Sequence, residues 1–231
     1  MDFTIKILIA FIGVLIPSLG LVLLTKFNPK AEEKSFFIPS VFVTAWVLVY
    51  YSLAGHGFFL PNPGVLFPNL FLLVLPIVLG IILYFTRKEF QKLLDSIPLD
   101  WLTTFQVYRV LGVIFLILYF EKELPGIFAI PAGLGDLAIG VAAPFVGARL
   151  KKGKGGKTGA VIWNSAGLLD FALALTLGFL SVPGPFQQLA LDTPNLLIGT
   201  FPYVLIPVIL VPFSTLLHLL GLRRLGLGGK S

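Results

Sequence analysis

The chain alternates between long apolar stretches and short polar ones. A helix rises about 1.5 Å per residue and the hydrocarbon core of a bilayer is about 30 Å thick, so about 20 apolar residues are enough to cross it. The pattern predicts an all-α, polytopic transmembrane helical bundle of about seven helices, in a single domain over residues 1–231. The predicted spans are residues 3–24, 36–54, 65–85, 101–120, 124–150, 160–180 and 196–222.

The polar stretch between the third and fourth spans has its own periodicity. Within residues 88–97, Phe90, Leu93, Leu94 and Ile97 recur at intervals of three and four, with charged residues between them. This period places the apolar side chains on one face of a helix. We predict a short amphipathic helix that lies in the membrane interface.

Composition agrees with lipid as the solvent of this chain. Hydrophobic residues make up 57% of the sequence and charged residues 12%, against about a quarter charged in soluble domains. The mean hydropathy is +0.96. The chain has no cysteine, which excludes disulfides and thiolate chemistry. We expect neither a cofactor nor a metal site.

Basic residues gather in alternate loops and in the C-terminal tail. By the positive-inside rule, this distribution predicts an N-terminus outside and a C-terminus in the cytoplasm, in the cytoplasmic (inner) membrane of a bacterium. The net charge of +6 is therefore interpreted as a topology signal and an attraction to anionic lipid, and no nucleic-acid partner is expected. The residues on this side are Lys26, Lys30, Lys34, Arg87, Lys88, Lys92, Arg149, Lys151, Lys152, Lys154, Lys157, Arg223, Arg224 and Lys230.

Three ionisable residues fall deep inside predicted spans: Arg109, Asp136 and Asp170. A charge facing lipid costs several kcal/mol, so each is expected to face the bundle interior and to have a partner. Counted from the cytoplasmic helix ends, all three lie roughly 12–20 Å deep and can meet near one plane. Two carboxylates and one guanidinium leave a charge of −1, which a proton or a substrate cation would neutralise.

Other polar residues lie on the same helix faces. Gln106 is three residues before Arg109, and Trp163 is seven residues before Asp170. Asn164 lies one turn inside the same span. These residues complete the candidate ligand or ion site, for which no catalytic role is assigned.

The fifth predicted span contains a possible break. Pro131, Gly133 and Gly135 directly precede Asp136. Proline removes a helix hydrogen bond and clashes with the preceding turn, and the glycines allow a bend. We predict a broken helix near 131–135, whose free N–H groups point into the bundle.

A purely structural interpretation of the same residues is equally open. Arg109 would bridge Asp136 and Asp170 and hold the helices together. Asp136 would cap the second half of the broken helix. Gln106 would bond the carbonyl groups that Pro131 leaves free.

The two histidines carry less weight. His56 is predicted in an outside loop and His218 near the cytoplasmic end of the last span, so the two cannot ligate one haem within the chain. His218 is interpreted as an interfacial polar residue.

Three stretches resemble a group of uncharacterised bacterial multi-pass membrane proteins. They are Leu124-Pro-Gly-Ile-Phe-Ala-Ile-Pro-Ala-Gly-Leu-Gly-Asp136, Trp163-Asn-Ser-Ala-Gly-Leu-Leu-Asp170 and the segment from Pro202 to His218. The resemblance implies a bacterial setting and brings no activity, cofactor or catalytic residue with it.

Three function classes remain open. Transport or permeation of a small solute or ion is favoured, because three charges lie near the midplane beside the predicted break. A non-catalytic membrane subunit or ligand-binding sensor is the alternative. An intramembrane enzyme acting on a lipid, quinone or isoprenoid is least favoured, because no nucleophile–base pair has a recognisable spacing. Besides the lipid bilayer, the expected partner is a small molecule or lipid; the sequence does not indicate an oligomeric state.

Overall fold

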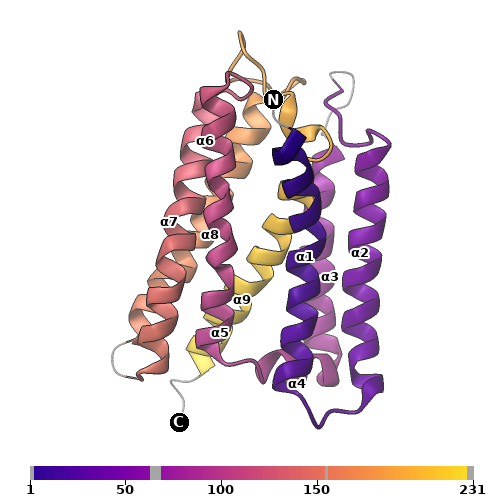
Figure 1. Cartoon of the computed structure of the whole chain (residues 1–231), viewed down its shortest axis with the longest axis vertical. Helices are drawn as coiled ribbons and strands as arrows, with labels where there is room; N and C mark the ends of the chain where they lie inside the picture. Colours follow the sequence, from indigo (N-terminus) through magenta and orange to yellow (C-terminus); the bar gives the residue numbers. More distant parts are fainter. Residues whose placement is uncertain (1–2, 63–68, 154–155, 228–231) are drawn as a thin grey trace.

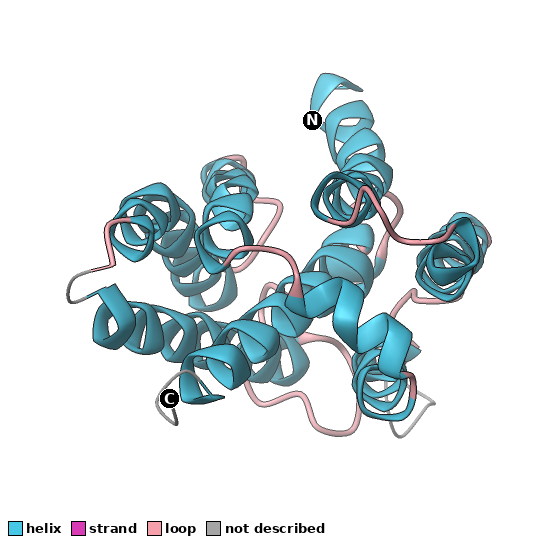
Figure 2. Ribbon diagram, turned by 90° about the horizontal axis from the view of Figure 1, so that it is seen from below, coloured by secondary structure: helices cyan, strands magenta, loops and turns pink. Residues whose placement is uncertain are grey.

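The fold is an all-helical bundle. The structure, a computed structural model, describes residues 3–62, 69–153 and 156–227, and every element in these ranges is helical. Figure 1 shows the long helices side by side, with the two chain ends at opposite ends of the bundle. Figure 2, seen from below, shows most of them end-on. We call the end with the loops around Lys30, Arg87 and Lys152 the basic end, and the other the N-terminal end.

Seven helical stretches in the described residues are long and apolar enough to cross a membrane, which confirms the predicted number by length and composition. They are Phe3–Phe27, Glu33–Gly55, Asn69–Thr86, Leu99–Phe120, Gly126–Lys151, Gly156–Ser181 and Ile206–Gly226. The α-helices are α1 (Phe3–Phe27), α2 (Phe37–Gly55), α3 (Val74–Thr86), α4 (Lys88–Asp95), α5 (Leu99–Phe105), α6 (Val113–Phe120), α7 (Gly126–Lys151), α8 (Gly156–Ser181) and α9 (Val211–Leu227). The short turns are η1 (Glu33–Phe36), η2 (Asn69–Leu73), η3 (Gln106–Gly112), η4 (Leu197–Gly199) and the π-helical η5 (Ile206–Leu210). Residues 65–68 of the third predicted span lie outside the described residues.

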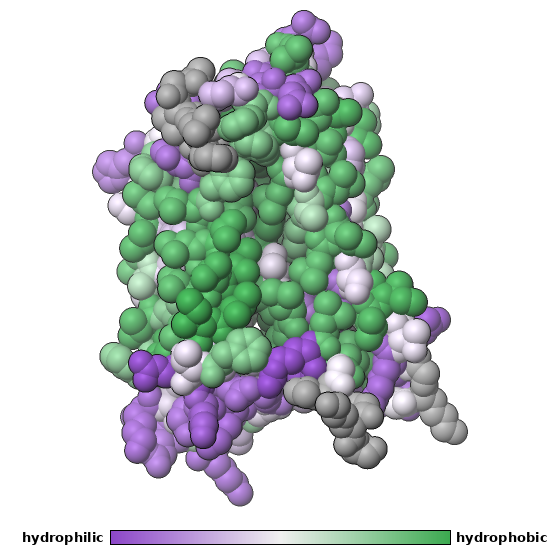
Figure 3. Space-filling view, turned by 180° about the vertical axis from the view of Figure 1, so that it is seen from behind, coloured by the Kyte–Doolittle hydropathy of each residue, from purple (hydrophilic) through white to green (hydrophobic). Residues whose placement is uncertain are grey.

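The outside of the bundle is apolar. Figure 3 shows hydrophobic residues over the middle of one face and hydrophilic residues gathered at the basic end. Large apolar side chains on α6, α7 and α8 point outward, and Phe120 is 79% exposed. Phe145 and Leu169 are similarly exposed. A surface of this kind fits a protein whose side chains face lipid.

The last helix begins later than predicted. Residues 196–205 form η4 and turns, and the helix starts at Ile206. Proline is consistent with the later start, because it lacks the backbone N–H of an interior helical residue and favours positions before a helix or in its first turn. Pro207 lies in the first turn of η5, whereas Pro202 lies before it.

The amphipathic stretch forms α4, and its apolar face is covered by protein. Phe90 and Leu93 are buried and belong to one core cluster with Leu24, Tyr84 and Leu220. These partners come from α1, α3 and α9 at the basic end. Helix α4 therefore closes the basic end of the bundle between these helices.

Helix α9 lies between two groups of helices. Figure 1 shows it crossing obliquely between α1–α3 and α5–α8. It packs against α3, α5 and α8, while α7 packs against η3, α5, α6 and α8. Side chains from η3, α7, α8 and α9 consequently converge at the centre of the bundle.

Candidate functional site

The three deep charges meet at this centre. The Nε of Arg109 on η3 donates to Oδ1 of Asp136 on α7 at 2.7 Å, and its Nη2 donates to Oδ2 of Asp170 on α8 at 2.5 Å. The Arg109 side chain is 2% exposed, and the carboxylate side chains are 14% and 11% exposed. One guanidinium therefore ties three elements together, because its donors leave in fixed and different directions.

The remaining arm of the guanidinium points to a residue that was not predicted in the site. Nη1 of Arg109 lies 2.8 Å from Nε2 of His218 on α9. The prediction that His218 is an interfacial polar residue is wrong: its side chain is completely buried. It lies about two turns after the start of α9, and the close packing of α9 against α8 brings it to the cluster.

Hydrogen bonds assign the tautomer of His218. A guanidinium only donates, so Nε2 of His218 accepts from Arg109 and Nδ1 carries the proton. Nδ1 then donates to Oδ1 of Asn164 at 2.9 Å, and Nδ2 of Asn164 donates to the carbonyl of Ala160 at 2.8 Å. Arg109, His218 and Asn164 thus form one directed chain that ends on the backbone of α8.

Aromatic rings enclose the polar cluster. The guanidinium carbon of Arg109 lies 3.9 Å from the ring centre of Phe171, a cation–π distance. The ring of Trp163 lies 4.9 Å from that of His218, and its Nε1 donates to the carbonyl of Ile139 at 3.1 Å. Trp163 therefore holds His218 in place and is kept in place by α7.

Helix α7 runs from Gly126 to Lys151 and includes the stretch where we predict a break. Pro131 lies inside α7, in its second turn, and removes one backbone donor there without ending the helix. The glycines serve close packing. A Cβ at Gly135 would overlap the carboxylate of Asp170, and one at Gly133 would crowd Leu116. Asp136 lies inside this helix, with helical residues on both sides of it.

Replacement of Gly135 by alanine is expected to lower stability by about 1–3 kcal/mol, because overpacking at the cluster forces the Asp170 carboxylate away from Arg109. Thermal unfolding in detergent measures the effect. Gly159→Ala in α8 is the matched control, since nothing lies within 4 Å of its added methyl group. Alanine favours a helix over glycine by about 1 kcal/mol, so the control should unfold no earlier than the wild type. Equal loss in both variants would contradict the close contact.

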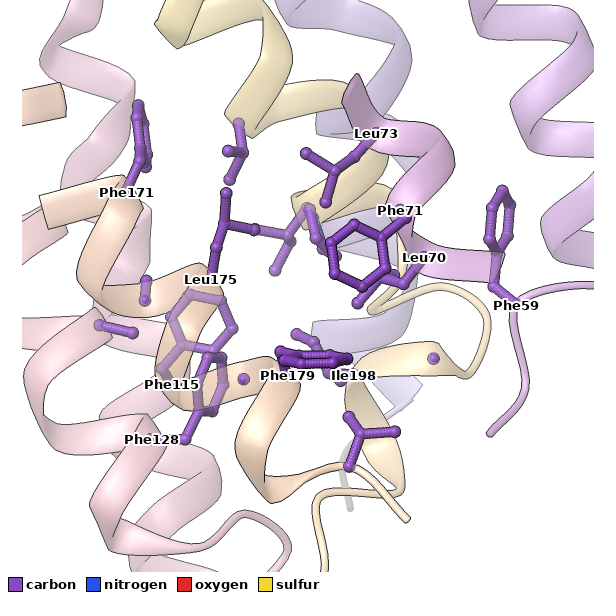
Figure 4. A pocket seen from close by; sticks show the side chains of 18 of the residues that line it. Phe59, Leu70, Phe71, Leu73, Phe115, Phe128, Phe171, Leu175, Phe179 and Ile198 are labelled. Atoms are coloured by element: carbon purple, nitrogen blue, oxygen red, sulfur yellow. The ribbon is translucent and has the colours of Figure 1, made fainter. Parts of the chain in front are cut away.

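A cavity of about 100 Å³ reaches Asp136 from the N-terminal end of the bundle. We call it the phenylalanine cavity, because it is lined by Phe59, Phe71, Phe115, Phe128, Phe171 and Phe179, among other apolar residues. Figure 4 shows these rings arranged around it, from several elements. Asp136 is the only ionisable residue among the described residues that line it.

A smaller cavity of about 40 Å³ reaches Asp136 from another side. Arg109, Tyr108 and Ser214 line it, and the hydroxyl groups of Tyr108 and Ser214 lie 2.5 Å apart. Phe115 and Phe171 border both cavities. Asp136 thus forms part of the shared wall of an apolar chamber and a more polar one.

Comparison with known families places most of this architecture in one domain. Residues 66–226 match a family described as a domain of unknown function (DUF8737). The chain belongs to this family. The DUF8737 region contains the whole Arg109 cluster, whereas α1 and α2 lie before it. Comparisons with curated proteins and with solved structures gave no match.

The other predicted site residues of this DUF8737 protein have different positions. Asp170 contacts Arg109 and lines neither cavity. Trp163 and Asn164 support His218 and do not reach the cavities. Gln106 is 1% exposed, and its Oε1 has no hydrogen-bond partner among the described residues. A bond from Gln106 to carbonyls near Pro131 could be donated only by its Nε2 amide group, so that part of the structural interpretation stays a prediction.

Nothing in the described part of the chain resembles a metal centre. No three His, Cys, Asp or Glu side chains lie close enough there to hold an ion. The chemistry of the cluster is that of one fixed positive charge, two carboxylates and a neutral imidazole. What it offers a ligand is a desolvated negative charge at Asp136.

Proposed function

We propose that this protein transports a small organic cation across the membrane and that Asp136 is its receptor. The observation that carries the proposal is the position of Asp136. Among the described residues it is the only carboxylate on the wall of the apolar, aromatic cavity, and it also lines the second cavity. Only its Oδ1 accepts from Arg109, and the side chain keeps 14% of its surface. The other oxygen is available to a ligand.

Charge and ring chemistry select a cation. With both carboxylates ionised, the cluster of Arg109, Asp136 and Asp170 carries −1, and burial makes an uncompensated charge costly. A ligand with one positive charge neutralises it. The aromatic rings that line the phenylalanine cavity add cation–π attraction, which suits alkylammonium groups with an apolar body.

Two helical irregularities beside the cluster supply places where the bundle can rearrange. Arg109 lies in the 3₁₀ segment η3, and the π-helical η5 precedes Ser214 on the last span. Segments of both kinds inside spans often mark hinges or functional sites. In the proposed orientation, the basic end faces the cytoplasm of a bacterium and the phenylalanine cavity receives the cation from outside.

Uptake by proteoliposomes tests this function. Radiolabelled tetraethylammonium is the probe, because its permanent charge keeps it from crossing lipid unaided. We expect uptake by the wild type and loss of most of it in Ala174→Phe, which fills the phenylalanine cavity from α8. Ala172→Phe, on the exposed face of the same helix, is the control. Equal uptake with both variants, or none above protein-free vesicles, would overturn the proposal.

A ligand-binding sensor or subunit is the second candidate. Trp163, His218 and Asn164 fill the space between the cluster and the basic end with mutually bonded side chains. A ligand at Asp136 would then be bound there and would not continue to the basic end. Saturable binding of the probe without flux would favour this candidate over transport.

A further inference from the structure

A larger cavity shares no lining residue with the two cavities at the Arg109 cluster. It has a volume of about 330 Å³, within the range of small-molecule and lipid sites, and lies among α1, α2, α3, α4 and α9. We call it the basal cavity, because α4 and Arg223 border it at the basic end. Its walls are otherwise apolar, with Trp46 at one end and Phe90 at the other.

Arg223 is the only charged side chain among the described residues that line the basal cavity. It contacts both oxygens of Asp95 at 3.4 Å, long for charged partners, and its side chain remains 28% exposed. The guanidinium lies 4.5 Å from the ring centre of Tyr84. Arg109, by contrast, is 2% exposed with carboxylate contacts of 2.5–2.7 Å. Arg223 therefore keeps donors for another anion.

The surroundings favour a particular amphiphile. The cavity runs along α2 from Pro39 to Trp46, a length of about 10 Å at the helical rise, parallel to the long helices. An alkyl chain suits this shape and its apolar walls. The basic end also carries Lys26, Lys30 and Arg87, which attract an anionic leaflet. An apolar chamber in the membrane with a cation at its mouth is complementary to an acyl chain with an anionic headgroup.

We propose that the basal cavity binds one anionic phospholipid of the leaflet at the basic end. Its phosphate lies on the guanidinium of Arg223, where a charge-assisted, bidentate contact is available. One acyl chain occupies the space between α2, α3 and α9. The lipid joins α1 and α2 to α9, and this site is independent of the cation site at Asp136.

Native mass spectrometry of the full chain after exchange with vesicles tests the headgroup. The vesicles contain phosphatidylglycerol or phosphatidylcholine. We expect one retained phosphatidylglycerol, and about tenfold weaker retention of it by Arg223→Gln. Lys92→Gln removes a charge from the same end of the bundle, on the exposed face of α4, and should retain the lipid like the wild type. Equal retention of the two lipids, or by the two variants, would overturn the proposal.

A second pair of variants tests the acyl chain without touching the ion pair of Arg223 and Asp95. Val43 lines the basal cavity, whereas Val41 on the same helix is exposed away from it. Val43→Trp should lose the retained lipid and Val41→Trp should keep it. Inorganic phosphate in excess should not displace the lipid, because it cannot fill the cavity. Retention by Val43→Trp, or displacement by phosphate, would show that no chain occupies the cavity.

Discussion

Replacement of Arg109 by leucine is expected to destabilise the bundle by about 3–5 kcal/mol, the cost of removing one partner from a buried ion pair. The variant leaves Asp136 and Asp170 buried without their shared donor. It also leaves Nε2 of His218 without its donor. Arg109→Lys should recover only part of this loss, because an ammonium group cannot reach three acceptors in the directions that a planar guanidinium does.

Unfolding in detergent, followed by the loss of helical circular dichroism, measures this effect. Lys92→Leu is the control, because its ion pair with Glu89 is exposed and contributes little. Replacing both carboxylates by amides in the Arg109→Leu background should restore much of the stability, since no unpaired charge then remains. Additive effects of the three substitutions would contradict the cluster, because residues in one network are coupled.

Replacement of Asp136 by asparagine is expected to weaken the binding of tetraethylammonium by about 2 kcal/mol or more, which is about 30-fold in Kd. The substitution keeps the shape of the side chain and removes the charge that faces the phenylalanine cavity. Equilibrium dialysis of purified protein in detergent measures the affinity. Thermal unfolding in parallel separates lost binding from lost folding.

Asp170→Asn is the matched control for this prediction. It makes the same change to the charge of the cluster and loses a similar contact with Arg109, but Asp170 lines neither cavity. Its Kd should change clearly less than that of Asp136→Asn. Equal weakening by both variants would indicate that the cluster acts through its total charge and that Asp136 has no direct contact with the ligand.

Hydropathy predicts those features of this molecule that depend on its lipid surroundings, namely the number of spans and the deep charged residues. The number of spans follows from the length and apolar character of the segments, because few structures other than an apolar helix of about 20 residues can cross the hydrocarbon core. The deep charges of Arg109, Asp136 and Asp170 are equally visible, because an unpaired charge at that depth is too costly to leave in lipid. Counting residues from the helix ends predicts that the three side chains lie at a similar depth, and in the structure they are in contact.

Packing decides what the sequence does not reveal. His218 lies in an apolar helix near a basic tail, and only the packing of α9 against α8 brings it into contact with Arg109. Pro131 and the glycines beside it are compatible with a break in the helix and equally with close helix packing. In the structure, Gly135 packs closely against Asp170. None of the three cavities can be predicted from one stretch of sequence, because each is lined by residues from four or more elements.

The most direct test of the central claim, that Asp136 receives a ligand in the phenylalanine cavity, is native mass spectrometry of protein extracted gently from cells. Wild type, Asp136→Asn and Asp170→Asn are compared without added probe. A small cationic molecule retained by the wild type and by Asp170→Asn, and lost from Asp136→Asn, is the expected result. The same adducts on all three folded proteins would contradict the claim and leave the Arg109 cluster with a structural role alone.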